Sequence, residues 1–257
     1  MSRIISIHSF RGGTGKSNIT ANLATIIAQQ GQRVGVIDTD IQSPGIHILF
    51  GLDEEQMDKA LNDYLWGKCA VEETAYNVGA ALKMGEGEVA VMGEGIYLIP
   101  SSLKAGEISR VLREGYDVSL LNDGFRELIG RLKLDYLFID THPGLNEETL
   151  LSIAISDVLL IILRPDQQDY QGTAVAVDVA RKLDIPRMLL VVNKALTSFD
   201  FAEVKRTMEE TYGCQVAGVL PLSEDVVRLA SAGIFCLRYP DHPVTQELHR
   251  IAARITI

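Results

Sequence analysis

Seven short apolar runs, spaced along the whole chain, constrain the fold more than any other feature of the sequence. Each run is rich in β-branched and aliphatic residues and is apolar almost throughout, which is typical of strands buried on both faces of a parallel sheet. The runs are RIISIHS (3–9), RVGVID (33–38), GIYLIP (95–100), LDYLFID (134–140), DVLLIILR (157–164), RMLLVVN (187–193) and QVAGVLP (215–221). The sequence therefore predicts an α/β fold with a doubly wound, mostly parallel sheet and helices on both faces.

Amphipathic segments with recognisable ends lie between these runs. Gly31 and Gly213 close two of them, since glycine is favoured just past the C-terminus of a helix. Pro243 opens the last, because proline fits the first turn of a helix. The expected helices cover residues 17–31, 118–132, 170–183, 200–213 and 243–255.

Residues 53–94 interrupt this alternation. The segment is rich in acidic residues and glycine, and EGEVAVMGEG (86–95) has the composition of a hairpin or loop. We expect a surface excursion between the second and third core strands, inside one domain that spans residues 1–257. We expect family-specific function to lie in this segment.

Composition and charge exclude several classes of protein. The chain has 257 residues, of which 47% are hydrophobic, and a formal net charge of −10, so bulk electrostatics would not attract a polyanion. Cys69, Cys214 and Cys236 are odd in number and far apart, which predicts packed thiols rather than disulfides or a C-x-x-C site. The N-terminal apolar run is too short for a secretory signal, and the longest run, VLLIIL, is too short to span a membrane. These features predict a soluble, cytoplasmic protein.

A glycine-rich stretch, SFRGGTGKSN (9–18), lies between the first predicted strand and the first predicted helix. That setting is typical of a phosphate-binding loop, although the common G-x-x-x-x-G-K-[ST] pattern would need glycine where Phe10 stands. The glycines would let backbone N–H groups approach phosphate oxygens, Lys16 would add a positive charge, and the Ser17 hydroxyl would ligate Mg²⁺. The residues that we expect to contact nucleotide here are Gly12, Gly13, Thr14, Gly15, Lys16, Ser17 and Asn18.

Three aspartates follow apolar strands at positions where a magnesium nucleotide would need carboxylates. Asp38 ends the second predicted strand, Asp40 comes just beyond it, and Asp140 ends the fourth. The carboxyl ends of parallel strands form the ligand crevice of an open α/β sheet. We therefore expect Lys16, Asp38 and Asp140 to converge.

Four segments together resemble the MinD/ParA family of positioning ATPases, which carry a deviant Walker A loop. They are FRGGTGKSNITANLA (10–24), GVIDTDIQSPGIHILFGL (35–52), DYLFIDTHPG (135–144) and VLPLSEDVVRLASAG (219–233), in the family's order and with similar spacing. In that family the loop reads x-K-G-G-x-x-G-K-[ST] or a variant with one fewer spacer. The resemblance explains why Phe10 is not glycine, and it covers nearly the whole chain.

The resemblance implies an ATPase that uses ATP and Mg²⁺ in a P-loop fold. Lys16 and Ser17 match the loop lysine and the magnesium-binding hydroxyl, and Asp38 matches the aspartate that orients or activates water. Asp40 and Asp140 match carboxylates near the magnesium, which often act through water.

Further matches concern the second switch and the base site. Gly144 matches a flexible glycine of the second switch, and Asn193 matches a residue that contacts adenine. Pro221 and Leu222 match the start of the other wall of the base site. From the sequence alone, an asparagine after a strand is equally a turn residue.

Arg11 departs from the family pattern, since it stands where the family has a signature lysine that crosses the interface of an ATP-bound dimer. Arginine retains the charge, and its planar group can hold phosphate oxygens at two points, as arginine fingers do. Three readings stay open: Arg11 acts in trans as a catalytic residue, another basic residue replaces it, or the family's dimer does not form. Lack of the signature lysine is a feature shared with the ATPases that distribute carboxysomes.

The resemblance also suggests partners. MinD-type members end in a basic amphipathic helix that binds membrane, whereas here Val244, Leu248, Ile251 and Ile255 share a helix face with few cations beside it, so we expect a core helix. ParA-type members hold nucleoid DNA non-specifically through surface cations. The candidate cations here are Arg181, Lys182, Lys205, Arg206, Arg228, Arg238 and Arg250.

The function expected from the resemblance is an ATPase switch. ATP would promote a homodimer that binds a surface, and an adaptor protein would stimulate an otherwise slow hydrolysis and so position a plasmid, a chromosome or a protein organelle. A nucleotide-binding scaffold with little turnover is the alternative. An iron–sulfur carrier would need paired cysteines, which the sequence lacks, and a small-molecule kinase or ligase would need an acceptor pocket such as residues 53–94 could supply.

Overall fold

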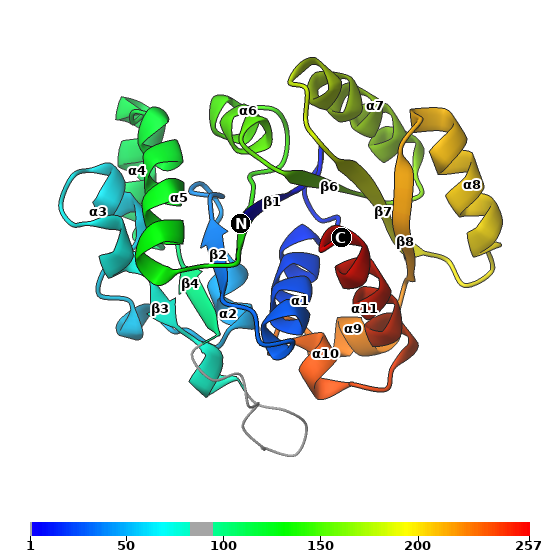
Figure 1. The fold of residues 1–257 in the computed structure, drawn as a ribbon, viewed down its shortest axis with the longest axis horizontal. Coiled ribbons are helices and arrows are strands. Elements are labelled where there is room, and N and C mark those ends of the chain that lie inside the picture. Colours follow the sequence, from blue (N-terminus) through cyan, green and yellow to red (C-terminus); the bar gives the residue numbers. More distant parts are fainter. Residues whose placement is uncertain (1, 83–94) are drawn as a thin grey trace.

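One twisted sheet organises the molecule, and the computed structural model describes it over residues 2–82 and 95–257 (Figure 1). The strand order is β3-β4-β2-β5-β1-β6-β7-β8, and every pairing is parallel except that of β3 with β4. The strands are β1 (Arg3–His8), β2 (Val34–Asp38), β3 (Tyr76–Asn77), β4 (Ile96–Ile99), β5 (Tyr136–Asp140), β6 (Val158–Leu163), β7 (Met188–Ala195) and β8 (Gln215–Pro221). The predicted fold class is confirmed.

Helices cover both faces of this sheet (Figure 1). On one face lie α1 (Lys16–Gln29), α2 (Ile46–Leu49), α9 (Glu224–Leu229), α10 (Phe235–Arg238) and α11 (Pro243–Ile255). On the other lie α3 (Leu61–Leu65), α4 (Ala105–Glu114), α5 (Ser119–Leu132), α6 (Glu147–Ala154), α7 (Gln167–Lys182) and α8 (Phe201–Tyr212). Among these residues, no helix is long and apolar enough to cross a membrane.

The strand β6 shows why nearly continuous apolar runs suit this architecture. All six of its residues are buried, and successive side chains point to opposite faces of the sheet. Leu160 and Ile162 join the core beneath α1 and α11, whereas Leu159, Ile161 and Leu163 join the core beneath α7 and α8. Burying both faces requires an apolar residue at every position of the strand.

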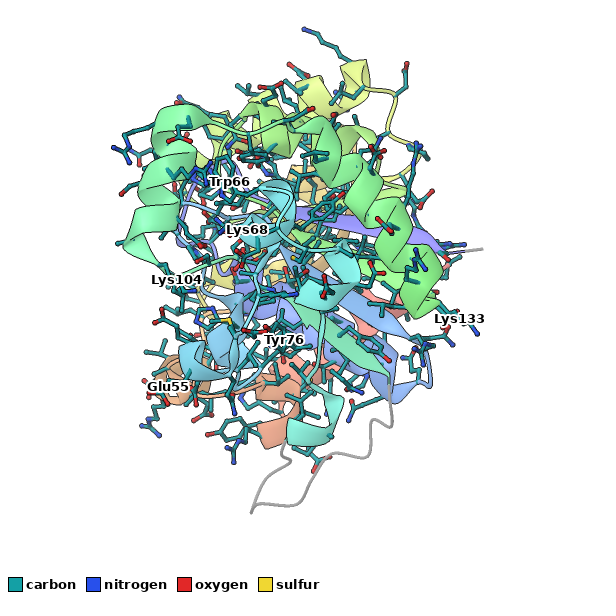
Figure 2. The ribbon with its side chains drawn as sticks, turned by 90° about the vertical axis from the view of Figure 1, so that its left-hand side faces the viewer. Glu55, Trp66, Lys68, Tyr76, Lys104 and Lys133 are labelled. Carbon is teal, nitrogen blue, oxygen red and sulfur yellow. The ribbon has the colours of Figure 1, made fainter. Side chains whose placement is uncertain are left out.

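The part of the 53–94 segment that the structure describes lies along the β4 edge of the sheet (Figure 2). It contains the short 3₁₀ turns Glu54–Gln56, Val71–Thr74 and Gly79–Ala81 beside α3 and β3. Leu61 and Val71 are buried in the same core cluster as Phe125 of α5, so this stretch contributes to the core as well as to the surface. Most of the hairpin expected over 86–95 lies outside the described residues.

Candidate nucleotide site

The glycine loop joins β1 to α1 and leaves the N-terminus of that helix pointing at the edge of the sheet where β1, β2 and β5 end. Gly13 and Gly15 have φ values of +77° and +91°, in the left-handed region that favours glycine. Gly15 is the N-cap residue of α1, and Lys16 is its first residue. The first-turn N–H groups of α1 are therefore free of helical partners and available to an anion.

Lys16 and Asp140 form a buried ion pair at the centre of the site. The Lys16 ammonium lies 2.9 Å from Asp140 Oδ1, and the two side chains are 7% and 1% exposed. Thr20, one helical turn after Lys16, donates its hydroxyl to the same carboxylate oxygen at 3.1 Å. The expected convergence of Lys16 with Asp140 is present, and Thr20 is a member of the site that the sequence analysis missed.

Asp38 lies opposite Asp140 in the pairing of β2 with β5, and it is 1% exposed. Its carboxylate accepts backbone hydrogen bonds from Asp40 at 3.0 Å and from Gly45 at 3.2 Å. Burial, and then the negative charge of Asp140, raise the pKa of Asp38 to about 7, although Lys16 acts in the opposite direction. A carboxyl group with such a pKa can exchange a proton near neutral pH.

Asp40 sits at the mouth of the site beside the loop that follows β5. Its Oδ1 lies 3.8 Å from His142 Nε2, and burial raises its pKa. Gly144, two residues further along, has φ +89° and donates its N–H to the Ser9 carbonyl at 3.2 Å. This contact ties the loop after β5 to the start of the glycine loop.

His8 forms part of the floor of the site at the end of β1. It is fully buried, and burial, with the charge of Lys16, lowers its pKa to about 3. Thr141 gives its hydroxyl hydrogen to the Ile7 carbonyl, so it accepts a hydrogen bond from His8 Nδ1–H at 3.0 Å. The imidazole is thus neutral, and its Nε2 has no partner among the described residues. The sequence analysis did not identify His8 as part of the site.

Phe10 and Arg11 both lie against α7, which explains the departure from the common loop pattern. A Cβ on Gly172 would come within 2.2 Å of the Phe10 ring, so only glycine leaves room for the phenylalanine there. The Arg11 guanidinium donates to Gln168 Oε1, and its Nε lies 3.9 Å from the buried Asp169 carboxylate. The side chain remains 39% exposed.

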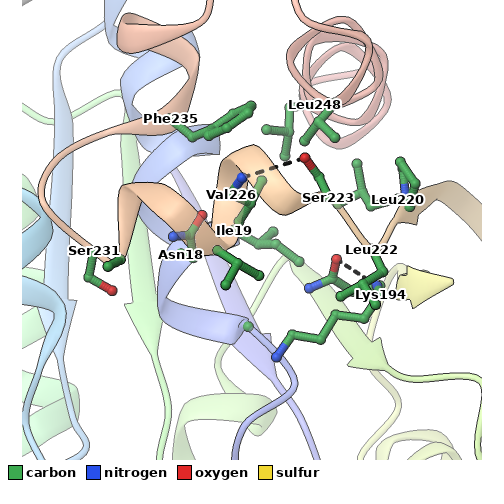
Figure 3. Close-up of a pocket in the computed structure, with 16 residues that line it drawn as sticks. Asn18, Ile19, Lys194, Leu220, Leu222, Ser223, Val226, Ser231, Phe235 and Leu248 are labelled. Carbon is green, nitrogen blue, oxygen red and sulfur yellow. Dashed lines mark hydrogen bonds between the residues drawn. The ribbon is translucent and has the colours of Figure 1, made fainter. Parts of the chain in front are cut away.

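A cavity of about 300 Å³ opens beside the loop, and its lining is predominantly apolar (Figure 3). Asn193, Pro221 and Leu222 line it, as the resemblance implied for a base site. Asn193 Nδ2 also donates to the Thr14 carbonyl at 2.7 Å, and Lys194 Nζ donates to the Gly13 carbonyl at 2.8 Å. Lys194 is a further residue that the sequence analysis missed.

The oxygen donors needed by a magnesium ion are present near the loop. Ser17 is on the first turn of α1, and Asp40 and Asp140 follow their strands at the same edge of the sheet. Among the described residues, no group of three or more acidic, histidine or cysteine side chains forms a ready metal cage. The oxygens of Ser17, Asp40 and Asp140 suit Mg²⁺, because this ion is usually bound by one or two carboxylates and completes its shell with phosphate oxygens and water.

The C-terminal helix packs on the core, as its apolar face indicated. Val244, Leu248, Ile251 and Ile255 are at most 5% exposed and belong to the core cluster that includes α1. Several of the candidate DNA-binding cations have carboxylates nearby. Arg181, Lys205, Arg228 and Arg250 lie 3.8, 3.9, 3.5 and 2.8 Å from an acidic oxygen.

Comparison with known proteins agrees with this geometry. The model of the CobQ/CobB/MinD/ParA nucleotide binding domain matches residues 5–234. An uncharacterized ATP-binding protein of Methanocaldococcus jannaschii is 28% identical over 256 residues, which cover 99% of this chain and 88% of that protein. An iron-sulfur cluster carrier protein of Pyrococcus horikoshii is 24% identical over 266 residues, or 98% of this chain and 84% of the carrier.

Solved structures show the same fold. The septum site-determining protein MinD of Pyrococcus horikoshii, in complex with Mg-ADP, has a TM-score of 0.80 at 21% identity, with 99% of this chain and 96% of that one covered. The sheet, the glycine loop and the helix that follows it define a P-loop nucleotide-binding protein. The chain belongs to the CobQ/CobB/MinD/ParA family.

Proposed function

We propose that this protein is a magnesium-dependent ATPase switch of the MinD/ParA kind, which dimerises with ATP and positions an intracellular cargo. The observation that carries the proposal is the convergence of Lys16, Asp140 and Asp38 beside the N-terminus of α1. The Mg-ADP complex of the related MinD fold supports the choice of cofactors. Mg²⁺, when bound, would neutralise phosphate charge that develops during the transfer to water.

Each residue of the site has a role in this proposal. The backbone N–H groups of the glycine loop and the Lys16 ammonium bind the phosphates, while Ser17 and the carboxylates of Asp40 and Asp140 hold the metal directly or through water. Asp38 orients the attacking water. Its pKa of about 7 supports that role, because a group that titrates near the working pH can accept a proton in the transition state.

Arg11 would act across the interface of the dimer in place of the signature lysine. Its contacts with Gln168 and Asp169 keep the guanidinium close to its own loop and still partly exposed. A planar guanidinium can exchange these partners for the phosphate oxygens of ATP bound to the facing subunit. We propose that ATP-driven dimerisation makes this exchange.

The proposal also includes a surface that the ATP-bound dimer binds and a cargo that it positions. Nucleoid DNA is the surface that we favour, because α11 has its apolar face in the core and is not left to bind a membrane. An adaptor protein would stimulate hydrolysis, and a carboxysome-like organelle is one candidate cargo. Binding to DNA that is insensitive to both salt and ATP would contradict the choice of surface, since phosphate contacts weaken steeply as salt rises.

Two alternatives are less well supported. Iron–sulfur carriers are among the relatives, but no two of Cys69, Cys214 and Cys236 are close in sequence, and Cys214 and Cys236 are buried. A nucleotide-binding scaffold without turnover would have little use for a carboxyl group held as Asp38 is, with backbone donors on both of its oxygens.

Phosphate release from Mg-ATP tests the enzymatic part of the proposal. We expect slow turnover by the wild type, and a further loss of about 10²-fold to 10⁴-fold in Asp38→Asn, with ATP affinity retained, because general-base groups contribute about that much. Equal turnover in the wild type and Asp38→Asn would exclude Asp38 from the chemistry. ATP binding without turnover in the wild type, even with cell extract added, would favour the scaffold.

A further inference from the structure

Two successive residues at the end of β7 hold two successive carbonyl groups of the glycine loop. Asn193 Nδ2 lies 2.7 Å from the Thr14 carbonyl oxygen, and Lys194 Nζ lies 2.8 Å from the Gly13 carbonyl oxygen. Figure 3 shows the Lys194 side chain extended along one side of the cavity. The strand that supplies both residues is separated from β1 by β6, so neither contact follows from strand pairing.

The geometry of a peptide bond gives these two contacts a consequence for phosphate binding. A trans peptide is planar, and its C=O and N–H point in opposite directions. The Gly13 carbonyl shares a peptide unit with the Thr14 N–H, and the Thr14 carbonyl shares one with the Gly15 N–H. Holding both carbonyls on the β7 side therefore directs the N–H groups of Thr14 and Gly15 away from β7, where they are available to phosphate oxygens.

The backbone at Lys194 is adapted to this contact. Side chains of neighbouring strand residues point to opposite faces, so a regular strand could not send both residues to the loop. Lys194 has φ +58°, a left-handed conformation that is strained for lysine, and the pairing of β7 with β8 is irregular between Val192 and Ala195. Strain of this kind persists where the surrounding structure requires it, and it is frequent at functional sites.

The absence of a side chain at Gly15 leaves room for the contact between Asn193 and the Thr14 carbonyl. A Cβ at this position would lie 2.5 Å from Asn193 Nδ2, so a side chain there would displace the asparagine. Asn193 is fixed further by its Oδ1, which accepts the Lys194 N–H at 2.9 Å. One Nδ2 hydrogen remains, so the contact with the loop is compatible with the base contact expected of Asn193.

We propose that Asn193 and Lys194 are positioning residues that preorganise the phosphate loop by holding the Gly13 and Thr14 carbonyls. The assignment rests on the proposed nucleotide site, and it adds a function for Lys194, which is not a residue of the glycine loop. Hydrogen bonds on these carbonyls also polarise the two peptide units and make their N–H groups better donors to phosphate.

The test compares Mg-ATP with adenosine, because the proposed contacts act on phosphate and not on the base. We expect Lys194→Gly and Asn193→Ala each to weaken Mg-ATP binding by about 2-fold to 10-fold, the usual effect of one hydrogen bond. Lys194 also lines the cavity, so adenosine affinity, measured by NMR titration, should fall by less than Mg-ATP affinity in Lys194→Gly. Lys194→Arg keeps the cation and should retain most of the affinity for Mg-ATP, measured by calorimetry.

Lys133 provides a matched control for the change of backbone. It is an exposed lysine with φ 50° that caps α5, and Lys133→Gly relieves the same kind of strain far from the loop. We expect wild-type Mg-ATP affinity in this variant, and unfolding midpoints close to that of the wild type in both glycine variants.

Three results would overturn the assignment of Asn193 and Lys194 as positioning residues. Unchanged Mg-ATP affinity in both Lys194→Gly and Asn193→Ala would remove the positioning role while leaving the proposed function intact. Equal losses for adenosine and Mg-ATP in Lys194→Gly would place its effect on the base. A wild-type protein that does not bind Mg-ATP would overturn the proposed function and this assignment together.

Discussion

Asp140 links the charges of the site at the scale of single residues. Its buried carboxylate accepts hydrogen bonds from both Lys16 and Thr20, and it faces Asp38 across the sheet. Removing only the cation of such a pair leaves an uncompensated buried charge. This lowers the stability of the fold more than removing both charges does. Lys16 therefore contributes to the stability of the unliganded protein, in addition to its proposed role in phosphate binding.

Lys16→Met should accordingly lower the free energy of unfolding by about 3 kcal/mol at pH 8. Adding Asp140→Asn should restore most of that stability, because the uncompensated charge is gone, but it should not restore ATP binding. Urea denaturation without nucleotide measures both effects. Lys205→Met is the control, since it removes a surface pair 3.9 Å long and should change stability by less than about 1 kcal/mol. Equal midpoints for Lys16→Met and the wild type would contradict this account of the pair.

His8 makes the stability of the fold depend on pH. Its pKa is lowered to about 3 in the folded protein, so the unfolded chain, with an ordinary pKa of 6.5, takes up the proton first as the pH falls. Stability is therefore lost below pH 6.5, by about 2 kcal/mol between pH 7 and pH 5 from this group alone. Denaturant unfolding at both pH values should show this loss in the wild type relative to His8→Asn, where no such group titrates. A difference between the two proteins that does not vary with pH would exclude the buried neutral imidazole.

Residues of the site differ in how well the sequence predicted their positions. Lys16, Asp38 and Asp140 were predicted to converge because each lies at the end of a strand in a pattern with a known geometry. Thr20 was within reach of the same argument, since it is one helical turn from Lys16. His8 and Lys194 were not, because their roles arise from contacts with Thr141 and Gly13, which lie far from them in sequence.

At the scale of elements, the contact between the glycine loop and α7 is the least conventional feature of the site. Phe10 fills the space that Gly172 leaves open, and Arg11 binds the first turn of the same helix. The loop is thus attached to α7 on one side and to β7 on the other. A change in the position of α7 should therefore alter the conformation of the glycine loop, where we propose that phosphate binds.

Gly172→Ala tests this attachment. The added Cβ would lie 2.2 Å from the Phe10 ring, and we expect a loss of about 1–3 kcal/mol of stability from overpacking. Gly130→Ala is the matched control, because Gly130 is also in a helix and a Cβ there meets nothing within 4 Å, so the change should be neutral or stabilising. Thermal unfolding compares the two. A Gly172→Ala loss that persists in a Phe10→Ala background would show that Phe10 is not the cause.

The elements themselves were predicted unevenly. All seven core strands were predicted to within two residues at each end, because strands buried on both faces must be apolar throughout. The helix α7 begins at Gln167 rather than 170, since Asp166 caps it by accepting the Asp169 N–H. The short helices α2, α3, α6, α9 and α10, and the longer α4, were not predicted. Only Val111 is buried in α4, which is otherwise mostly polar and so offers few apolar positions.

At the scale of the whole molecule, one chain is half of the proposed ATP-bound dimer. The glycine loop, Arg11 and the loop after β5 are gathered at one edge of the sheet, where a second subunit could meet them. The formal net charge of −10 on each chain opposes association, so dimerisation needs a specific gain from the nucleotide. No pattern within a single sequence reports that gain, because it arises only between two folded copies.

Molar mass in solution tests the central claim most directly. Light scattering should show the 28.2 kDa chain as a monomer without nucleotide and as a dimer with Mg-ATP. The dimer should persist in Asp38→Ala, which we expect to bind ATP without hydrolysing it, and should be lost in Arg11→Ala, which lacks the proposed contact across the interface. A dimer that is unchanged in Arg11→Ala would move that contact to another residue. A monomer in every case, with Mg-ATP bound at saturation, would contradict the switch.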